Sequence, residues 1–550
     1  MHKRRFVPLI GGALVSLGLV VSPAYGSAGF DVQANNPQVA GQPDSNKTAV
    51  FPTNKSNEPS IAADPAAPAH LIAGANDEQE QPACGAAVRN STPGDCSFFP
   101  GVGTNGVYTS DDGGTTWVNR GLIDDQASWK SSALLSDGDP VLFYGPRPDK
   151  KGTRAYYVSL ASYKPGKSPY PPNKAPELIV LSHSDDHGRT WSAPTVAATK
   201  ANPNNFNDKP SAWADLSPSS PYYGQIYVAW TQFRSADPAG PSAPVMVARS
   251  TDYGAGFGAP AQLSPAYNNG GIGGRQGSAV RTGPDGTVYV AWEEASSQVV
   301  AVSTDGGATY GKPVVAGSVA DIADPIPGAN FRTDSFASLA ADPRAGKTTV
   351  HLAWVNRTSG GGRVVVATST DRGRTWSAPV QVSGAAQGYA FFQGLDVAPD
   401  GRVDVGFQGL TAKDPSTYGT GNAAIDSWYV GRSATGTWSA PRKVSTASSD
   451  PAVSAQNNLQ RQFWGDYNTV VSTADKAYFI YTDGRNGAGC PAVDAYQKAL
   501  NAAGIPVAPD DPAEGTDAPG DAGTITEPVV PAECPAQFGN TDSYVSVVTP

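Results

Sequence analysis

Short runs in which apolar and aromatic residues alternate with small or polar residues recur along the whole chain. Two examples are VYVAW at 288–292 and RVVVAT at 363–368. Because successive side chains of a strand point to opposite faces of a sheet, such runs predict β-strands. A helical pattern is confined to AVDAYQKALNAAG at 492–504. The pattern therefore predicts an all-β protein.

The predicted strands form a repeat. A pair of strands joined by a turn starts clearly at residues 59, 210, 277, 337 and 394, and more loosely at 139 and 467. Each full unit then has a third strand, a turn that contains an aspartate, and a fourth strand. Four antiparallel strands repeated about every 50 to 75 residues are typical of the blades of a β-propeller.

The seventh unit has only two of its strands, and the chain ends on a third candidate strand, DSYVSVV at 542–548. We expect the missing fourth strand to come from 30–35, which would close the ring and cover exposed sheet edges. The prediction is one domain over 27–550, a seven-bladed propeller closed by an N-terminal strand. A six-bladed ring with the last unit appended is the alternative.

The turn between the third and fourth strands has a recurring pattern, clearest in STDRGRTW at 369–376. Its aspartate can accept hydrogen bonds from turn amides, and Gly373 supplies the positive φ that a tight turn needs. The equivalent aspartates of the five copies are Asp112, Asp186, Asp252, Asp305 and Asp371. In an up-and-down blade this turn lies on the face opposite to the start of the first strand. We therefore predict a structural role for it.

The pattern S-x-D-x-G-x-T-W resembles the Asp box of sialidases and other BNR-repeat propellers of the secreted bacterial type. STDYGAGF at 250–257 lacks the Thr and Trp, and SATGTW at 433–438 has lost the Asp. The resemblance covers most of the chain and implies the propeller fold. Asp boxes occur in glycosidases, in lyases and in propellers that only bind ligands, so the resemblance implies one of these classes.

The first 26 residues combine a basic start, a short apolar stretch and small residues before Gly26, as in a secretory signal peptide. We expect removal of this segment and a secreted protein without a membrane span. Loss of its three basic residues leaves 36 basic against 49 acidic residues, a net charge of −13. Such a charge disfavours nucleic acid as a partner. The segment at about 503–533 is acidic and rich in Pro, Gly and Ala, and it predicts a solvated loop in the last blade.

Four cysteines in an exported chain favour two disulfides, because no pair has the spacing of a zinc site. The local pairing joins Cys84 to Cys96 and Cys490 to Cys534, and two crossed pairings stay open. No residue pattern indicates a metal ligand set or a nucleotide motif. We expect no cofactor, a monomer and no metal, with structural calcium on an aspartate-rich loop as the open alternative.

Function should lie where first strands start and second strands end, because charged side chains gather there. Sialidase chemistry needs arginines that grip the substrate carboxylate, an acid, and a tyrosine activated by a glutamate. A neutral phenol avoids repulsion from that carboxylate. By order along the chain, the resemblance assigns Asp77 as acid, Glu293 or Glu294 as activator, Tyr467 or Tyr481 as nucleophile, and Arg275, Arg332 and Arg461 as the arginine cluster. Asp334 and Asp466 join the candidates, because they lie beside Arg332 and Tyr467.

The chain departs from sialidases in one motif: NEPSI at 57–61 has Asn57 where they have an arginine. Two hypotheses follow. The first is a secreted carbohydrate-active enzyme, a glycosidase or a related glycan-cleaving enzyme, that acts on an acidic glycan. The second is a non-catalytic propeller that binds glycans or proteins. An acid and a base in one pocket would favour the first.

Overall fold

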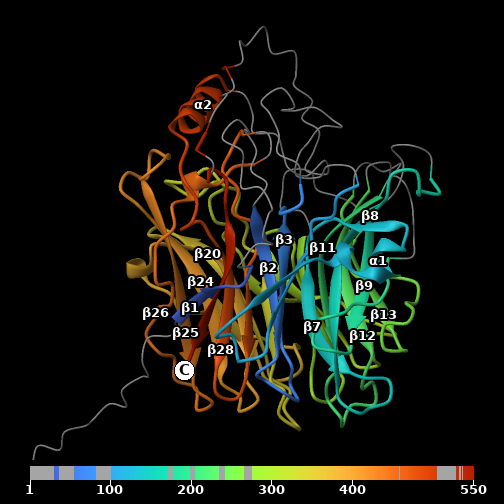
Figure 1. The fold of residues 1–550 in the computed structure, drawn as a ribbon. Helices are drawn as coiled ribbons and strands as arrows, with labels where there is room; N and C mark the ends of the chain where they lie inside the picture. The colour runs from blue at the N-terminus through green and yellow to red at the C-terminus, as the bar shows by residue number, and fades with distance from the viewer. Residues whose placement is uncertain are drawn as a thin grey trace, which may run out of the picture.

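The computed structural model is a seven-bladed β-propeller (Figure 1), as the repeat predicted. The structure describes residues 30–35, 55–81, 101–170, 177–198, 205–234, 242–265, 276–456, 459–504, 528–529, 531, 534–535 and 537–550. In blades one, three, four, five and six the strands follow one another in chain order from the channel outward, and all strands pair antiparallel. The six-bladed alternative is wrong, because the last unit forms a blade of its own.

The strands of the blades have the following bounds. Blade one comprises β2 (Ser56–Ala63), β3 (Leu71–Asp77), β4 (Gly106–Ser110) and β5 (Val118–Leu122). Blade two comprises β6 (Leu134–Ser136), β7 (Val141–Pro146), β8 (Thr153–Tyr163), β9 (Leu178–Ser184) and β10 (Thr195–Val196), and both β6 and β7 pair with β8. Blade three comprises β11 (Asn205–Ala214), β12 (Ile226–Arg234), β13 (Val245–Ser250) and β14 (Ala261–Gln262). Blade four comprises β15 (Gln276–Thr282), β16 (Val288–Glu293), β17 (Ser297–Ser303) and β18 (Val314–Ser318).

The remaining three blades follow the same order. Blade five comprises β19 (Ser338–Ala341), β20 (Val350–Thr358), β21 (Gly361–Ser369) and β22 (Val380–Gln381). Blade six comprises β23 (Tyr389–Val397), β24 (Val403–Ala412), β25 (Ala423–Arg432) and β26 (Arg442–Lys443). Blade seven comprises β27 (Thr469–Ser472), β28 (Ala477–Asp483), β29 (Asp542–Val548) and, as its outer strand, β1 (Phe30–Gln33).

Blade seven is closed by the N-terminal strand, as predicted. Phe30 lies opposite Val547 and Gln33 opposite Tyr544 in the antiparallel pair of β1 and β29. Beyond the strand, Asn35 Nδ2 donates to Asp542 Oδ1 at 3.0 Å. The first and last strands of the described chain therefore form one edge of the same sheet.

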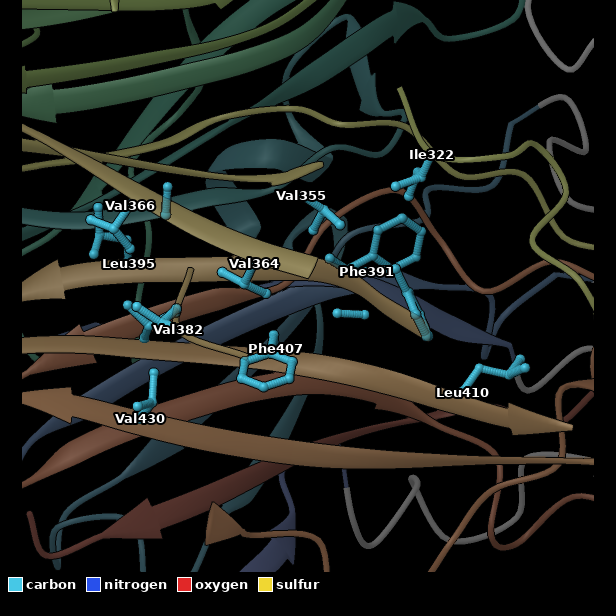
Figure 2. Close-up of a cluster of buried hydrophobic side chains, with 14 of the residues drawn as sticks. Ile322, Val355, Val364, Val366, Val382, Phe391, Leu395, Phe407, Leu410 and Val430 are labelled. Atoms are coloured by element: carbon cyan, nitrogen blue, oxygen red, sulfur yellow. The ribbon is translucent and has the colours of Figure 1, made fainter. Parts of the chain in front are cut away.

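The core lies between neighbouring blades. Figure 2 shows the cluster between blades five and six, where side chains of β20 and β21 pack against those of β23 and β24. The tryptophans of β12, β16 and β20, namely Trp230, Trp292 and Trp354, are fully buried in equivalent clusters. These tryptophans therefore fill space between blades and cannot present a sugar-binding face.

The turn with the recurring aspartate folds as its sequence predicted. Asp371 accepts from Ser369 Oγ at 2.8 Å, from the Thr375 amide at 2.9 Å and from Thr375 Oγ1 at 2.6 Å. Gly373 has φ of 74° and donates its amide to Ser369 Oγ at 2.9 Å. The same bonds recur around Asp112, Asp186 and Asp305, and in part around Asp252. These bonds hold the hairpin between the third and fourth strands.

Two α-helices interrupt the sheets in the described chain. The α1 helix (Ala127–Lys130) follows the 3-10 turn η2 (Ile123–Asp125), and two further 3-10 turns are η3 (Ala385–Gln387) and η4 (Pro451–Val453). The α2 helix (Pro491–Ala502), at the top of Figure 1, corresponds to the predicted helical segment. Neither helix has the length or hydrophobicity to span a bilayer.

The start of α2 is tied to the last blade by the disulfide Cys490–Cys534, one of the two local pairings predicted. Cys84 and Cys96 lie outside the described residues. The predicted signal segment, 1–26, and most of the acidic segment at 503–533 also lie outside them.

Candidate functional site

The first strands of several blades contain a β-bulge near the mouth, which we define as the end of the channel where first strands start and second strands end. In β2, β11, β15 and β23 the register shifts across two residues. The first of the two has a positive φ: Glu58 (54°), Lys209 (51°), Gly277 (63°) and Phe392 (46°). Asp139, just before β7, shares this conformation with φ of 53°. Side chains other than glycine rarely adopt it, and bulges redirect side chains near functional sites.

Asp466, three residues before β27, is the centre of the charged group at the mouth. Arg332 donates from Nε to Asp466 Oδ1 at 2.7 Å and from Nη2 to Oδ2 at 2.6 Å. Lys209 Nζ donates to the same Oδ2 at 2.5 Å. Arg332 Nη2 also lies 4.0 Å from Glu58 Oε1. We call Glu58, Lys209, Arg332 and Asp466 the mouth cluster; it joins blades one, three and seven and the segment before blade five.

A chain of hydrogen bonds supports the mouth cluster from blades one to three. Asn76 Nδ2 donates to Glu58 Oε2 at 2.6 Å, and Asn76 Oδ1 accepts from the Asp139 amide at 2.8 Å. Asp139 Oδ2 in turn accepts from the Lys209 amide at 3.1 Å. The bulged residues are thus linked to one another, which fixes the position of Glu58.

The two carboxyl groups of the mouth cluster have pKa values shifted in opposite directions. Burial, together with the charges of Asp466 and Asp139, raises the pKa of Glu58 well above its usual range. Burial also opposes ionisation of Asp466, but Arg332 and Lys209 outweigh it and hold the pKa of Asp466 below its usual range. Glu58 therefore holds its proton more tightly than an exposed glutamic acid does, whereas Asp466 favours its ionised form.

The two carboxyl groups are also close. Arg332 Nη2 is 4.0 Å from Glu58 Oε1 and 2.6 Å from Asp466 Oδ2, so these two oxygens lie at most about 7 Å apart. A proton donor and an ionised carboxylate within this range are what glycoside cleavage requires. The side chains of Glu58 and Asp466 are 4% and 5% exposed, whereas that of Arg332 is 21% exposed.

Aromatic side chains surround the cluster. The Lys209 ammonium lies 5.5 Å from the Phe336 ring centre, and the Arg332 guanidinium lies 5.3 Å from that of Phe463. Both rings are half-buried. The Tyr467 hydroxyl is buried and has no hydrogen-bond partner among the described residues. Burial, then the nearby charges of Asp139 and Glu58, raises the pKa of Tyr467 well above its usual range, so the phenol is neutral.

A cavity of about 700 Å³ occupies the channel below the mouth. Its lining starts at Lys209, Phe336 and Tyr467 and continues along the first strands to the turns that follow them on the opposite face. Inside the cavity the Arg281 guanidinium stacks on Trp213 at 4.2 Å. The mouth cluster therefore lies at one end of the channel cavity.

The structure brings some of the predicted site residues together. Arg332, Asp466 and Tyr467 meet at the mouth. Glu293 and Asp334 form a neighbouring carboxylate group together with Asp321. This second group was not predicted as a unit.

Other predicted residues have different surroundings. Asp77 is buried at the end of β3 and accepts from Tyr108 Oη at 2.6 Å, and burial raises its pKa to about 7. Glu294 Oε2 accepts from the Trp292 indole at 2.9 Å. Tyr481 is buried in blade seven and donates to Asp31 Oδ2 at 2.9 Å. Arg461 precedes Asp466 in the same segment, and Arg275 lies outside the described residues.

Sequence reasoning placed Glu58, Asp139 and Lys209 among the charged residues at the mouth but gave none of them a specific role. Each of them directly precedes a proline at the start of a first strand, in EPS, DPV and KPS. A charged residue before proline at three equivalent repeat positions was therefore the available signal. It is visible only once the seven units are aligned on their first strands.

No protein-family model matches the sequence, and no curated protein matches it either. The NanB sialidase of Streptococcus pneumoniae has a similar structure, with 12% identity, a TM-score of 0.37, and 75% of this chain and 80% of that chain covered. For the leech intramolecular trans-sialidase the identity is 14%, the TM-score 0.41 and the coverage 66% and 67%. The α-L-arabinofuranosidase of Fusarium graminearum has 13% identity and a TM-score of 0.41, with 92% of this chain and 97% of that chain covered. Similarities of this size carry no argument about the activity of this chain.

Proposed function

We propose that the protein is a carbohydrate-active enzyme that cleaves a glycosidic bond at the mouth of its propeller. Glu58 would donate a proton to the leaving-group oxygen, and Asp466 would stabilise the positive charge that develops on the sugar. Water would then add to the sugar and return a proton to the Glu58 carboxylate. The observation that carries the proposal is the pair of close carboxyl groups whose pKa values are shifted in opposite directions.

The surroundings of the pair agree with this assignment. Asp466 accepts three charge-assisted hydrogen bonds, so it is held as an anion in a fixed position. Both of its oxygens are already bonded, which suits a stabilising charge better than a nucleophile. The half-buried rings of Phe336 and Phe463 could contact the apolar faces of sugars.

The finer parts of the proposal concern substrate and location. We propose an exported, sialidase-like glycosidase of the Asp-box type that acts on an acidic glycan. A substrate carboxylate would share the Arg332 guanidinium with Asp466. Replacement Arg332→Lys keeps a positive charge beside Asp466 but removes the guanidinium N–H groups that a substrate carboxylate would share, and it should weaken binding of acidic glycans by about 1.5 to 3 kcal/mol while sparing neutral ones.

The test is a substrate screen with the purified protein. Neutral aryl glycosides, sialosides and uronic-acid polysaccharides would be assayed for reducing ends and for unsaturated products. Glu58→Gln should lower kcat by about 100-fold or more, because general-acid catalysis is worth at least that factor. Asp371→Asn on the opposite face should retain full activity.

Three outcomes separate the possibilities. Cleavage that Glu58→Gln does not slow would exclude Glu58 as the acid. Cleavage of neutral glycosides alone would keep the mechanism and reject the acidic substrate. Saturable glycan binding without any product would favour the non-catalytic propeller, in which the ion pairs of Asp466 only hold the blades together.

A further inference from the structure

Three carboxyl groups converge beside the mouth, where blade four is connected to blade five. Glu293 is the last residue of β16, Asp321 follows β18, and Asp334 precedes β19. One carboxylate oxygen from each lies within 4.8 Å of the other two. The end of β16 and the two ends of the connection between β18 and β19 thus place three acids around one point.

The environment of Glu293 is unfavourable without a cation. Glu293 is 3% exposed, and its Oε2, which is also buried, has no hydrogen-bond partner among the described residues. A buried carboxyl oxygen without a partner costs free energy, and two more carboxyl groups at this distance add repulsion. A bound cation would remove both costs.

We propose that Glu293, Asp321 and Asp334 bind a calcium ion. Calcium takes six to eight oxygen ligands at about 2.3 to 2.6 Å, so two ligands of one ion lie at most about 5 Å apart, as these oxygens do. Zinc favours histidine and cysteine ligands, and this group contains neither. Asp321 is exposed, which leaves a path for the ion and room for water ligands.

The site would stabilise the segment that carries Arg332. Asp334 lies two residues after Arg332, and the Ser335 amide donates to Asp334 Oδ1 at 2.6 Å. Ser335 also links this segment to both sides: its carbonyl accepts from Gln298 Nε2 at 2.8 Å, and its hydroxyl accepts from the Ile322 amide at 3.2 Å. A calcium ion here would therefore fix blade four to the segment that presents Arg332 to Asp466.

The experiment uses the full chain after treatment with a chelator, titrated with CaCl2 by calorimetry and followed by thermal unfolding. We expect one calcium ion per chain, and a rise in Tm of about 2 to 3 °C at a calcium concentration 100 times Kd. Glu293→Gln should weaken binding by at least about 10-fold. Asp321→Asn, at an exposed position that tolerates substitution, should do the same.

Glu294→Gln is the matched control, because it changes the neighbouring residue, whose carboxylate contacts the Trp292 indole. This variant should bind calcium like the wild type. No heat and no change in Tm with calcium would overturn the proposal, and so would equal binding by wild type and Glu293→Gln. Binding of Mg²⁺ or Zn²⁺ without Ca²⁺ would overturn the choice of metal. None of these readouts depends on glycan cleavage, so the calcium site and the proposed function can fail separately.

Discussion

Replacing Asp466 by asparagine tests whether the ion pairs of the mouth cluster stabilise the folded protein. The asparagine keeps the volume but removes the negative charge that Arg332 and Lys209 share. Removing one partner of a buried ion pair typically costs about 3 to 5 kcal/mol. Two nearby acids reduce that loss, because they ionise more readily once the charge of Asp466 is gone: Glu58 lies 4.0 Å from Arg332, and Asp208 lies 3.9 Å from Lys209. We therefore expect the free energy of unfolding at pH 7 to fall by about 2 to 4 kcal/mol.

The assay is urea unfolding monitored by tryptophan fluorescence, with thermal unfolding as a second readout. Asp285→Asn is the matched control, since Asp285 accepts from Arg372 Nε at 2.7 Å in a much more exposed pair. A surface pair contributes about 1 kcal/mol or less, so the control should lose little stability. Equal losses of unfolding free energy in the two variants, or no loss in Asp466→Asn, would refute the claim that these buried ion pairs stabilise the fold.

Three further variants test other parts of the structure. The pKa of Glu58 is raised in the folded protein and has its usual value in the unfolded chain. Above about pH 4.5 the unfolded chain therefore loses this proton first, and the free energy of unfolding falls as pH rises. Glu58→Gln cannot titrate and removes this effect. The stability of Glu58→Gln relative to wild type should therefore increase from pH 5 to pH 8, and a difference independent of pH would contradict the raised pKa. Asp371→Ala should lower Tm only slightly, because the hydrogen bonds of that turn are exposed, and it should leave activity intact; lost activity with unchanged Tm would give the turn a functional role. The double variant Cys490→Ser, Cys534→Ser removes a disulfide between residues 44 positions apart and should lower the free energy of unfolding by about 2 to 4 kcal/mol. An unchanged free energy of unfolding would mean that the disulfide does not form in solution.

The fold was predictable because each blade carries its own local signals. Alternating apolar residues mark the strands, and the Ser, Asp and Gly of each turn mark the step from third to fourth strand, as Ser369, Asp371 and Gly373 do. Even the closing strand followed from counting strands, because the last unit lacked one. Strands and turns that recur with local sequence patterns of this kind can be predicted without information on long-range contacts.

The site was predictable only in part. Arg332, Asp466 and Tyr467 could be named because they precede first strands and have reactive or charged side chains; the structure places them close together, and their functional roles stay a prediction. The partner of Asp466 in the proposed chemistry, Glu58, depends on a β-bulge that turns its side chain, and a bulge has no clear sequence pattern. Asp77 has the residue type and the place expected of the acid, yet Tyr108 satisfies it within its own blade. Several charged residues occupy equivalent positions in different blades. The closed ring decides which of them meet across the channel, and the sequence of a single strand does not show this.

The pairing of β1 with β29 has a consequence for how the molecule assembles. Phe30 meets Val547, so the ring can close only after the chain has been synthesised as far as β29. The entropy cost of joining such distant residues grows only slowly with the length of chain between them, but contacts of this range make folding slow. Until blade seven has assembled, the sides of blades six and one that contact β27 and β28 have no neighbour and can associate with other chains. Closure of the ring should therefore be a late step of folding, and association with other chains should compete with it at high protein concentration. A circularly permuted chain that joins β29 directly to β1 should reach the native state faster and aggregate less.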